Sequence, residues 1–232
     1  MGNGPGTMEL GLAGFIAVWT TMMAAMMLPA VAPVGSIHLQ TIRLRATGMA
    51  KALRIGALLA GYLGVWASVG IIGYFAALGA GRLVDDAPSA GRWVAAGILL
   101  VAGLYQLTPF KDRCLAHCRS PLGFLLHFGN YRGRLRDVRV GVYHGGYCVG
   151  CCWALFAVLV AVGIMNLAWM AGLALVIFLE KTWRHGKTLG LAVSIALIVY
   201  ACLTPAFPEL APGLVVSPDI GPGMEPAREM GG

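Results

Sequence analysis

Long apolar runs separated by short basic segments set the hydropathy pattern of this chain. Most of the runs are close to the ~20 residues that an α-helix needs to cross the hydrocarbon core of a bilayer. A longer stretch, from Gly145 to Leu179, carries no charged residue. As one helix it would be roughly 50 Å long, which exceeds a single ~30 Å crossing, so we divide it near residues 163–166.

The pattern predicts an all-α fold, a polytopic transmembrane helix bundle with about six spans. The predicted spans are residues 8–28, 55–81, 93–110, 147–165, 167–183 and 188–204. Residues 1–204 would therefore form a single transmembrane domain. Residues 205–232 are rich in proline and glycine, and this composition predicts a disordered tail.

Composition supports a membrane protein and removes one alternative. Hydrophobic residues make up 58% of the chain, charged residues 12%, and the mean hydropathy is +0.76, which leaves too little polar surface for a globule in water. The net charge of +7 could suggest nucleic acid. The cations, however, lie in short connections between apolar runs, where lipid headgroups and topology account for them. We expect the lipid bilayer as a partner and no nucleic acid.

Basic residues gather in alternate connections, and such connections are retained on the cytoplasmic side. The first, third and fifth connections carry Arg43, Arg45, Lys51, Arg54, Lys111, Arg113, Arg119, Arg132, Arg134, Arg136, Arg139, Lys181, Arg184 and Lys187. We therefore predict a multi-pass protein of the bacterial cytoplasmic (inner) membrane with both termini outside. Glu180 and Lys181, at the inner end of the fifth span, are expected to extend their charged ends to the interface.

That topology brings most of the sulfur and imidazole side chains to the cytoplasmic face. The candidate metal ligands are Cys114, His117, Cys118, Cys148, Cys151, Cys152, Met26 and Met27. Residues three and four apart share one face of a helix, so each cluster can point to a common site. Thiolate and thioether sulfur select Cu(I), whereas thiolate with imidazole also suits Zn(II). The methionines favour copper, because a thioether is a poor zinc ligand, and zinc is the alternative metal.

Each of these residue types also has an ordinary structural role. Cysteine buries readily and methionine fills irregular gaps, so the segment Met22 to Met27 taken alone is better explained by packing. The cysteines are harder to explain in that way. Cys114-x3-Cys118 and Cys148-x2-Cys151-Cys152 have a spacing similar to that of a metal site divided between two segments.

Several short motifs occur in an order that resembles a known family. They are Met22-Met-Ala-Ala-Met-Met-Leu-Pro29, Tyr105-Gln-Leu-Thr-Pro-Phe-Lys111, Cys114-Leu-Ala-His-Cys-Arg-Ser-Pro121, Gly145-Gly-Tyr-Cys-Val-Gly-Cys-Cys-Trp153, Met165-Asn-Leu-Ala-Trp-Met170 and Glu180-Lys181. This set is similar to the bacterial family of predicted metal-binding integral membrane proteins, some members of which carry the label copper chaperone. Phe156 departs from the family pattern, where we expect methionine.

The resemblance implies a membrane-embedded soft-metal protein that binds Cu(I) and holds, delivers or inserts it. Its partner would be a copper-dependent membrane protein or a soluble copper carrier, and catalysis is not expected. Two other classes stay open from the residues themselves. One is a membrane thiol–disulfide oxidoreductase that uses Cys148 and Cys151. The other is a structural zinc site that ties the third and fourth spans together.

Overall fold

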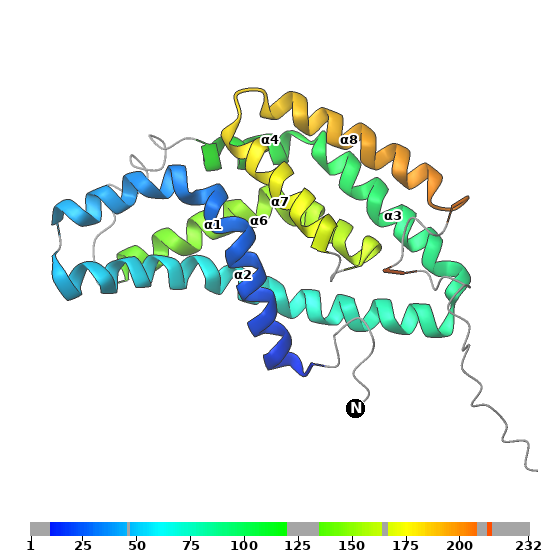
Figure 1. Cartoon of the computed structure of the whole chain (residues 1–232), viewed down its shortest axis with the longest axis horizontal. Coiled ribbons are helices and arrows are strands. Elements are labelled where there is room, and N and C mark those ends of the chain that lie inside the picture. Colours follow the sequence, from blue (N-terminus) through cyan, green and yellow to red (C-terminus); the bar gives the residue numbers. More distant parts are fainter. Residues whose placement is uncertain (1–9, 46, 120–134, 164–166, 208–212, 215–232) are drawn as a thin grey trace, which may run out of the picture.

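The computed structural model describes residues 10–45, 47–119, 135–163, 167–207 and 213–214. These residues are all-helical, as the apolar pattern predicts (Figure 1). The helices are α1 (Leu12–Arg45), α2 (Gly48–Asp86), α3 (Pro88–Gln106), α4 (Pro109–Arg119), α6 (Arg136–Val162), α7 (Leu167–Thr182) and α8 (Gly186–Leu203).

Four helical segments of the described residues are long and apolar enough to cross a membrane, namely Leu12–Ala32, Gly48–Leu83, Arg136–Val162 and Gly186–Leu203. The pair Ser89–Gln106 and Pro109–Arg119, bent by 63°, makes a fifth if it is taken as one broken span. The described residues therefore give four or five candidate spans, and the predicted six is not confirmed. α7 is not among the candidates, because its 16 residues fall short of a full crossing.

The charge-free stretch is divided between α6 and α7. α6 ends at Val162 and is followed by Gly163, whose φ of +99° lies in the region that favours glycine. α7 begins at Leu167, beyond residues 164–166, which lie outside the described residues. At its other end α6 begins at Arg136 and not at residue 147. The cysteines of α6 consequently lie near the middle of a long helix and not at the start of a span.

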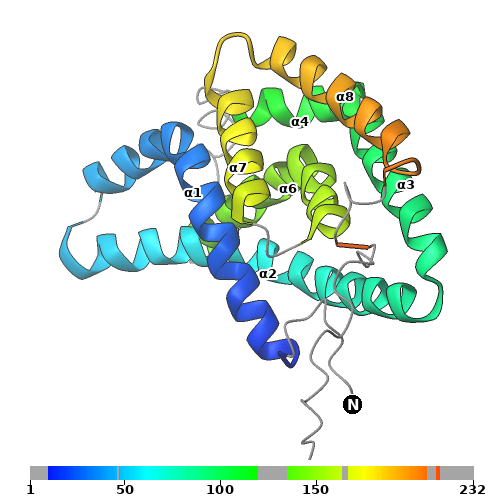
Figure 2. The same ribbon diagram turned by 45° about the vertical axis from the view of Figure 1, so that its right-hand side comes forward.

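α6 is the central helix. It packs against α2, α3, α4 and α7, and Figure 2 shows it surrounded by the other helices. Its closest approach is to α2, where a Cβ added to Gly141 would lie 2.1 Å from the Leu58 carbonyl oxygen, and one added to Gly61 would lie 2.3 Å from that of Val138. Small residues allow helices in a membrane to approach in this way. The contact fixes α6 against α2 beside the cysteines.

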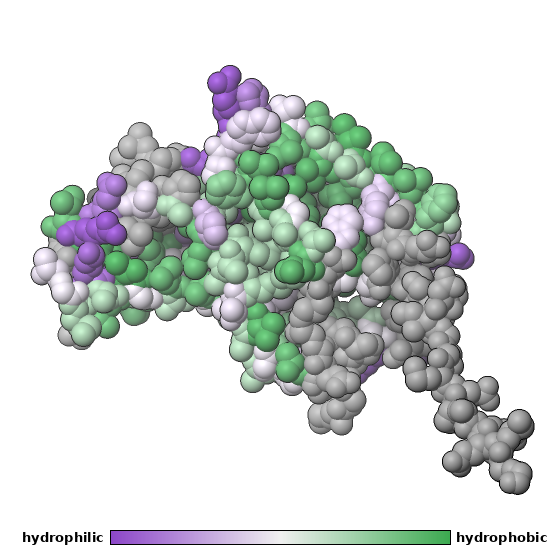
Figure 3. Space-filling view, viewed as in Figure 1, coloured by the Kyte–Doolittle hydropathy of each residue, from purple (hydrophilic) through white to green (hydrophobic). Residues whose placement is uncertain are grey.

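The outer surface suits a lipid environment. Hydrophobic side chains cover much of the face seen in Figure 3, while strongly hydrophilic ones gather at the junction of α1 and α2 and at the turn between α7 and α8. Large apolar side chains such as Ile72, Phe75 and Ile195 are more than half exposed. The expected disordered tail lies mostly outside the described residues. Of that tail, Gly213 donates its N–H to the Ala161 carbonyl at 3.1 Å and Leu214 is buried, so this short piece is packed.

Candidate metal centre

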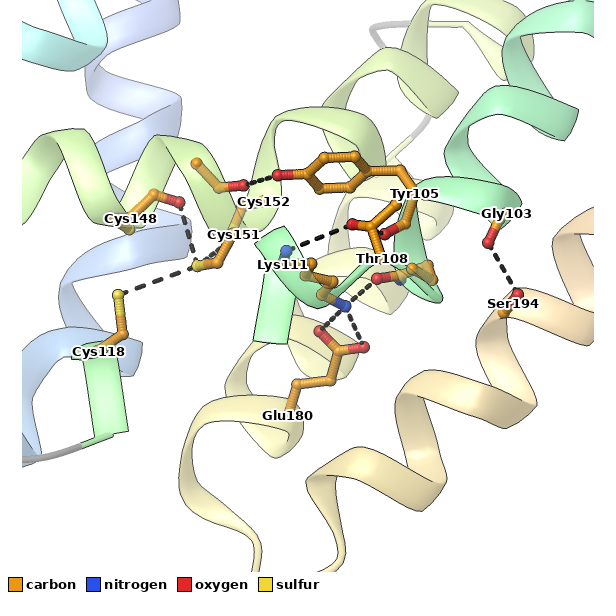
Figure 4. Close-up of polar contacts among 12 residues, drawn as sticks. Gly103, Tyr105, Thr108, Lys111, Cys118, Cys148, Cys151, Cys152, Glu180 and Ser194 are labelled. Atoms are coloured by element: carbon orange, nitrogen blue, oxygen red, sulfur yellow. Dashed lines mark hydrogen bonds and ion pairs between the residues drawn. The ribbon is translucent and has the colours of Figure 1, made fainter. Parts of the chain in front are cut away.

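Three cysteines of α6 form the centre of the candidate site. Cys148, Cys151 and Cys152 lie on one face of the helix, as their spacing predicts, and each is at most 2% exposed. The Sγ atoms of Cys151 and Cys152 are 3.2 Å apart, and the Cys151 thiol donates to the Cys148 carbonyl oxygen at 3.2 Å (Figure 4). The helix therefore presents three buried thiols to the interior of the bundle.

α4 brings a fourth cysteine to this group. The Cys118 Sγ lies 4.0 Å from the Cys151 Sγ (Figure 4). Cys114, one turn earlier, is also buried, and its Sγ would lie 3.0 Å from a Cβ added to Gly150. The bend of 63° between α3 and α4 sets the direction of this short helix. Two chain segments separated by residues 120–134 thus meet through sulfur.

α1 contributes one methionine of the predicted pair to the thiols. The Sδ of Met27 lies 3.9 Å from the Cys148 Sγ, and Met27 is fully buried. Met26 instead lines a groove of about 620 Å³ between α1 and α7, together with Met22 and Met170. Side chains at adjacent positions of a helix point in different directions. Met27 therefore lies against the thiols, while Met26 lies in the groove.

The predicted imidazole donor, His117, lies against tyrosines of α6. Its ring stacks on that of Tyr147, with centroids 4.0 Å apart and an interplanar angle of 22°, and it meets Tyr143 edge to face at 5.4 Å. A second histidine, His144 of α6, is buried, and its ring centroid lies 6.0 Å from that of Tyr62. Both imidazoles therefore pack against tyrosine rings.

Two residues that the sequence did not single out as site residues contact Cys148. The Nζ of Lys181 lies 3.0 Å from the Cys148 Sγ, and the Tyr62 hydroxyl lies 3.1 Å from the same sulfur. Lys181 is 7% exposed and Tyr62 is 4% exposed. The expectation that Lys181 extends to the interface is therefore wrong. A charged residue inside an apolar segment is the signal that could have identified it, because such residues are rare without a function.

Glu180 is also buried, contrary to the expectation that it extends to the interface. Both of its carboxylate oxygens accept from the Lys111 ammonium at 2.8 Å, and the Gln106 side-chain oxygen contacts the same ammonium (Figure 4). The side chains of Lys111 and Glu180 are each 3% exposed. This ion pair joins α4 to α7, the helices that carry Cys118 and Lys181.

The sulfur spacing is compatible with a metal held between two residues. With metal–sulfur bonds of about 2.3 Å, two sulfurs 4.0 Å apart subtend an angle of about 120° at the metal. The Cys148–Met27 spacing of 3.9 Å gives nearly the same angle. Among the residues that the structure describes, no three His, Cys, Asp or Glu side chains are grouped as a metal-holding set. What the arrangement offers is several neighbouring pairs of sulfur donors.

Comparison with known proteins adds one finding. A family model described as PpoB2, copper chaperone, matches residues 16–204. No curated protein and no solved structure matches the chain. The matched range contains every residue that contributes to the sulfur group.

Proposed function

The chain belongs to the PpoB2 copper chaperone family, and on that premise we propose that it binds Cu(I) inside the bundle and delivers it to a client protein. The observation that carries the proposal is the convergence of soft donors from helices far apart in the sequence. Cys118 of α4 and Met27 of α1 both lie within 4.0 Å of a cysteine sulfur of α6. A buried group made of sulfur favours Cu(I) over harder cations.

The thioether of Met27 distinguishes copper from zinc in this proposal. Zinc sites use cysteine, histidine and carboxylate ligands and close to four-coordinate sets when they are structural. A thioether next to thiols adds little for zinc, but it is a suitable third donor for Cu(I). We infer that copper is cargo, and that the bilayer of a bacterial cytoplasmic membrane surrounds the protein. The client would be a copper-dependent membrane protein or a soluble copper carrier.

Delivery requires that copper can leave, and the paired donors support this role. Cys118 lies near the end of α4, a helix of 11 residues that follows a bend. Its sulfur and those of α6 are close enough for copper to change one ligand at a time. A client thiol can replace one protein sulfur in such an exchange without free Cu(I) being released.

The proposal is tested by metal analysis of detergent-purified protein under reducing conditions. We expect the wild type to hold stoichiometric Cu(I), and the change of Cys148, Cys151 and Cys152 to serine to abolish binding, because it removes the thiols of α6. Cys202 is exposed and lies on α8, so Cys202→Ser is the matched control and should bind as the wild type does. Tightly held zinc would support the structural zinc site. A metal-free protein that cycles between dithiol and disulfide would support the oxidoreductase.

A second test separates the two methionines. Met27→Leu is expected to weaken Cu(I) binding by about tenfold while stability changes little, because leucine is close to methionine in volume and only the thioether is lost. The measurement is competition with a chromogenic Cu(I) chelator. Met26→Leu is the control, with affinity expected within about twofold of the wild type, since Met26 lines the groove between α1 and α7. Equal losses in both variants would contradict the assignment of the donor to Met27.

The predicted orientation is tested by labelling intact cells with a membrane-impermeant thiol reagent. In a Cys202→Ser background, a cysteine at Ala87, between α2 and α3, is expected to react. A cysteine at His185, in the exposed turn between α7 and α8, is expected to stay unlabelled until the cells are opened. The reason is the retention of basic connections in the cytoplasm. The opposite labelling pattern would reverse the molecule.

A further inference from the structure

Lys181 lies inside the sulfur group and is oriented toward it. Its Nζ is 3.0 Å from the Cys148 Sγ, and the thiols of Cys151 and Cys152 lie on the same face of α6 as Cys148. From α2, the Tyr62 hydroxyl lies 3.1 Å from the same sulfur. The ammonium is therefore directed at thiols and is almost removed from solvent.

The neighbouring charges are already engaged with each other. Glu180, the residue before Lys181, accepts from Lys111 through both carboxylate oxygens. Lys187, which follows on α8, lies 3.7 Å from Asp112 at an exposed position. Lys111 thus has a carboxylate partner within the bundle, whereas Lys181 contacts sulfur. A buried ammonium is costly unless an opposite charge balances it, and a thiolate at Cys148 would supply that charge.

A charge count connects this contact to the metal. Cu(I) bound by two thiolates forms a complex with one net negative charge, and in a dry site such a charge needs a partner. The ammonium of Lys181 makes the whole group neutral. A divalent cation with the same two thiolates would leave one positive charge unbalanced, and it reaches neutrality only if a third thiolate joins it.

We infer that Lys181 is a positioning and selectivity residue of the copper site, whose ammonium holds the Cys148 sulfur and balances a two-thiolate complex of a monovalent soft cation. This inference rests on the proposed function and deepens it. It assigns Lys181 no coordinate bond to copper. The side chain acts through the sulfur that it contacts and through its charge.

The test compares three lysine variants of the full-length protein in detergent under reducing conditions. Lys181→Leu removes the charge without adding a sulfur donor, Lys181→Arg keeps the charge, and Lys187→Met removes the charge of a side chain that is 76% exposed. Cu(I) affinity is measured by competition with a chromogenic Cu(I) chelator, and Zn(II) affinity with a zinc indicator. The ratio of the two affinities reports selectivity directly.

We expect Lys181→Leu to bind Cu(I) about 100-fold more weakly, because the negative charge of the buried complex loses its partner. Zn(II) affinity should not fall, because a divalent cation with two thiolates is already neutral without the ammonium. Lys181→Arg should stay within about threefold of the wild type for Cu(I), since its charge is retained. Lys187→Met should match the wild type for both metals, because it lies outside the sulfur group.

The outcomes separate this inference from the proposed function. A wild type that holds no Cu(I) overturns the proposed function, and the role of Lys181 with it. A wild type that binds Cu(I) tightly, with Lys181→Leu within about twofold of it, overturns the role of Lys181 alone. If Lys181→Leu does not fold, Lys181→Arg still decides. A role in packing predicts that the bulkier arginine loses copper, and such a loss in a folded protein would also overturn the inference.

Discussion

Gly141→Ala is expected to lower the free energy of unfolding by about 3 kcal/mol, although the change adds a single methyl group. The added Cβ would lie 2.1 Å from the Leu58 carbonyl oxygen and 2.8 Å from the Tyr62 backbone nitrogen. Both atoms belong to the backbone of α2, so α2 and α6 have to separate. Unfolding monitored by tryptophan fluorescence in detergent measures the effect.

Gly146 provides the matched control on the same helix. A Cβ added there meets no atom within 4 Å, so Gly146→Ala should stabilise the protein by up to about 1 kcal/mol through helix propensity alone. The two changes are chemically identical, and only the approach of α2 distinguishes them. A similar response at both positions would show that the contact between α2 and α6 does not limit stability.

The same substitution connects the fold to the site. Tyr62 belongs to α2, and its hydroxyl contacts the Cys148 sulfur of α6. This contact depends on the close approach of α2 to α6, which Gly141 allows. We therefore expect Gly141→Ala to weaken Cu(I) binding as well, whereas Gly146→Ala should not.

The sequence predicted well that the chain is helical and that several helices are long and apolar enough to cross a membrane, because the length of an apolar run is a direct physical requirement of the bilayer. It was less successful where charges lie inside helices. The predicted third connection includes Arg136 and Asp137, yet α6 begins at Arg136. Asp137 is buried and forms an ion pair with Arg54 at 2.8 Å. Charges that pair between helices cannot be recognised from one segment alone.

The start of α4 carries a sequence signal for a helix, although the polar composition of the segment suggests a connection. The segment is polar and was read as part of a connection. Thr108 precedes the helix, and its hydroxyl oxygen accepts from the Lys111 backbone N–H at 3.3 Å. Pro109 is the first helical residue, and Asp112 lies in the first turn. These are ordinary helix-start residues. These cap residues predict the start of the helix that carries Cys118.

Only the part of the candidate site that depends on local helix geometry could be predicted from the sequence. Helical spacing is a local property, so it predicted the shared face of Cys148, Cys151 and Cys152. The choice between Met26 and Met27, and the contact of Lys181 with Cys148, depend on how α1 and α7 are turned against α6. Packing between helices determines how each helix is rotated, so the spacing of residues within one helix cannot predict it.

The ion pair of Lys111 and Glu180 leads to the second large effect. Lys111→Met is expected to cost about 3–4 kcal/mol of unfolding free energy, because it leaves the Glu180 carboxylate buried without its partner. Lys187→Met is the control, since it breaks the Lys187–Asp112 pair, whose side chains are 76% and 52% exposed. Exposed pairs contribute about 0–1 kcal/mol, so this control should be nearly silent.

The double variant Lys111→Met/Glu180→Gln separates the charge from the packing. Removing both charges should recover most of the loss, since an amide is less costly to bury than an unpaired carboxylate. Because the pair joins α4 to α7, copper occupancy should follow the same order: low in Lys111→Met and largely restored in the double variant. If Lys111→Met kept full stability but lost copper, the pair would act on the metal site and not on the fold. If the double variant were as unstable as the single one, packing of the lysine stem, and not its charge, would be what holds α4 against α7.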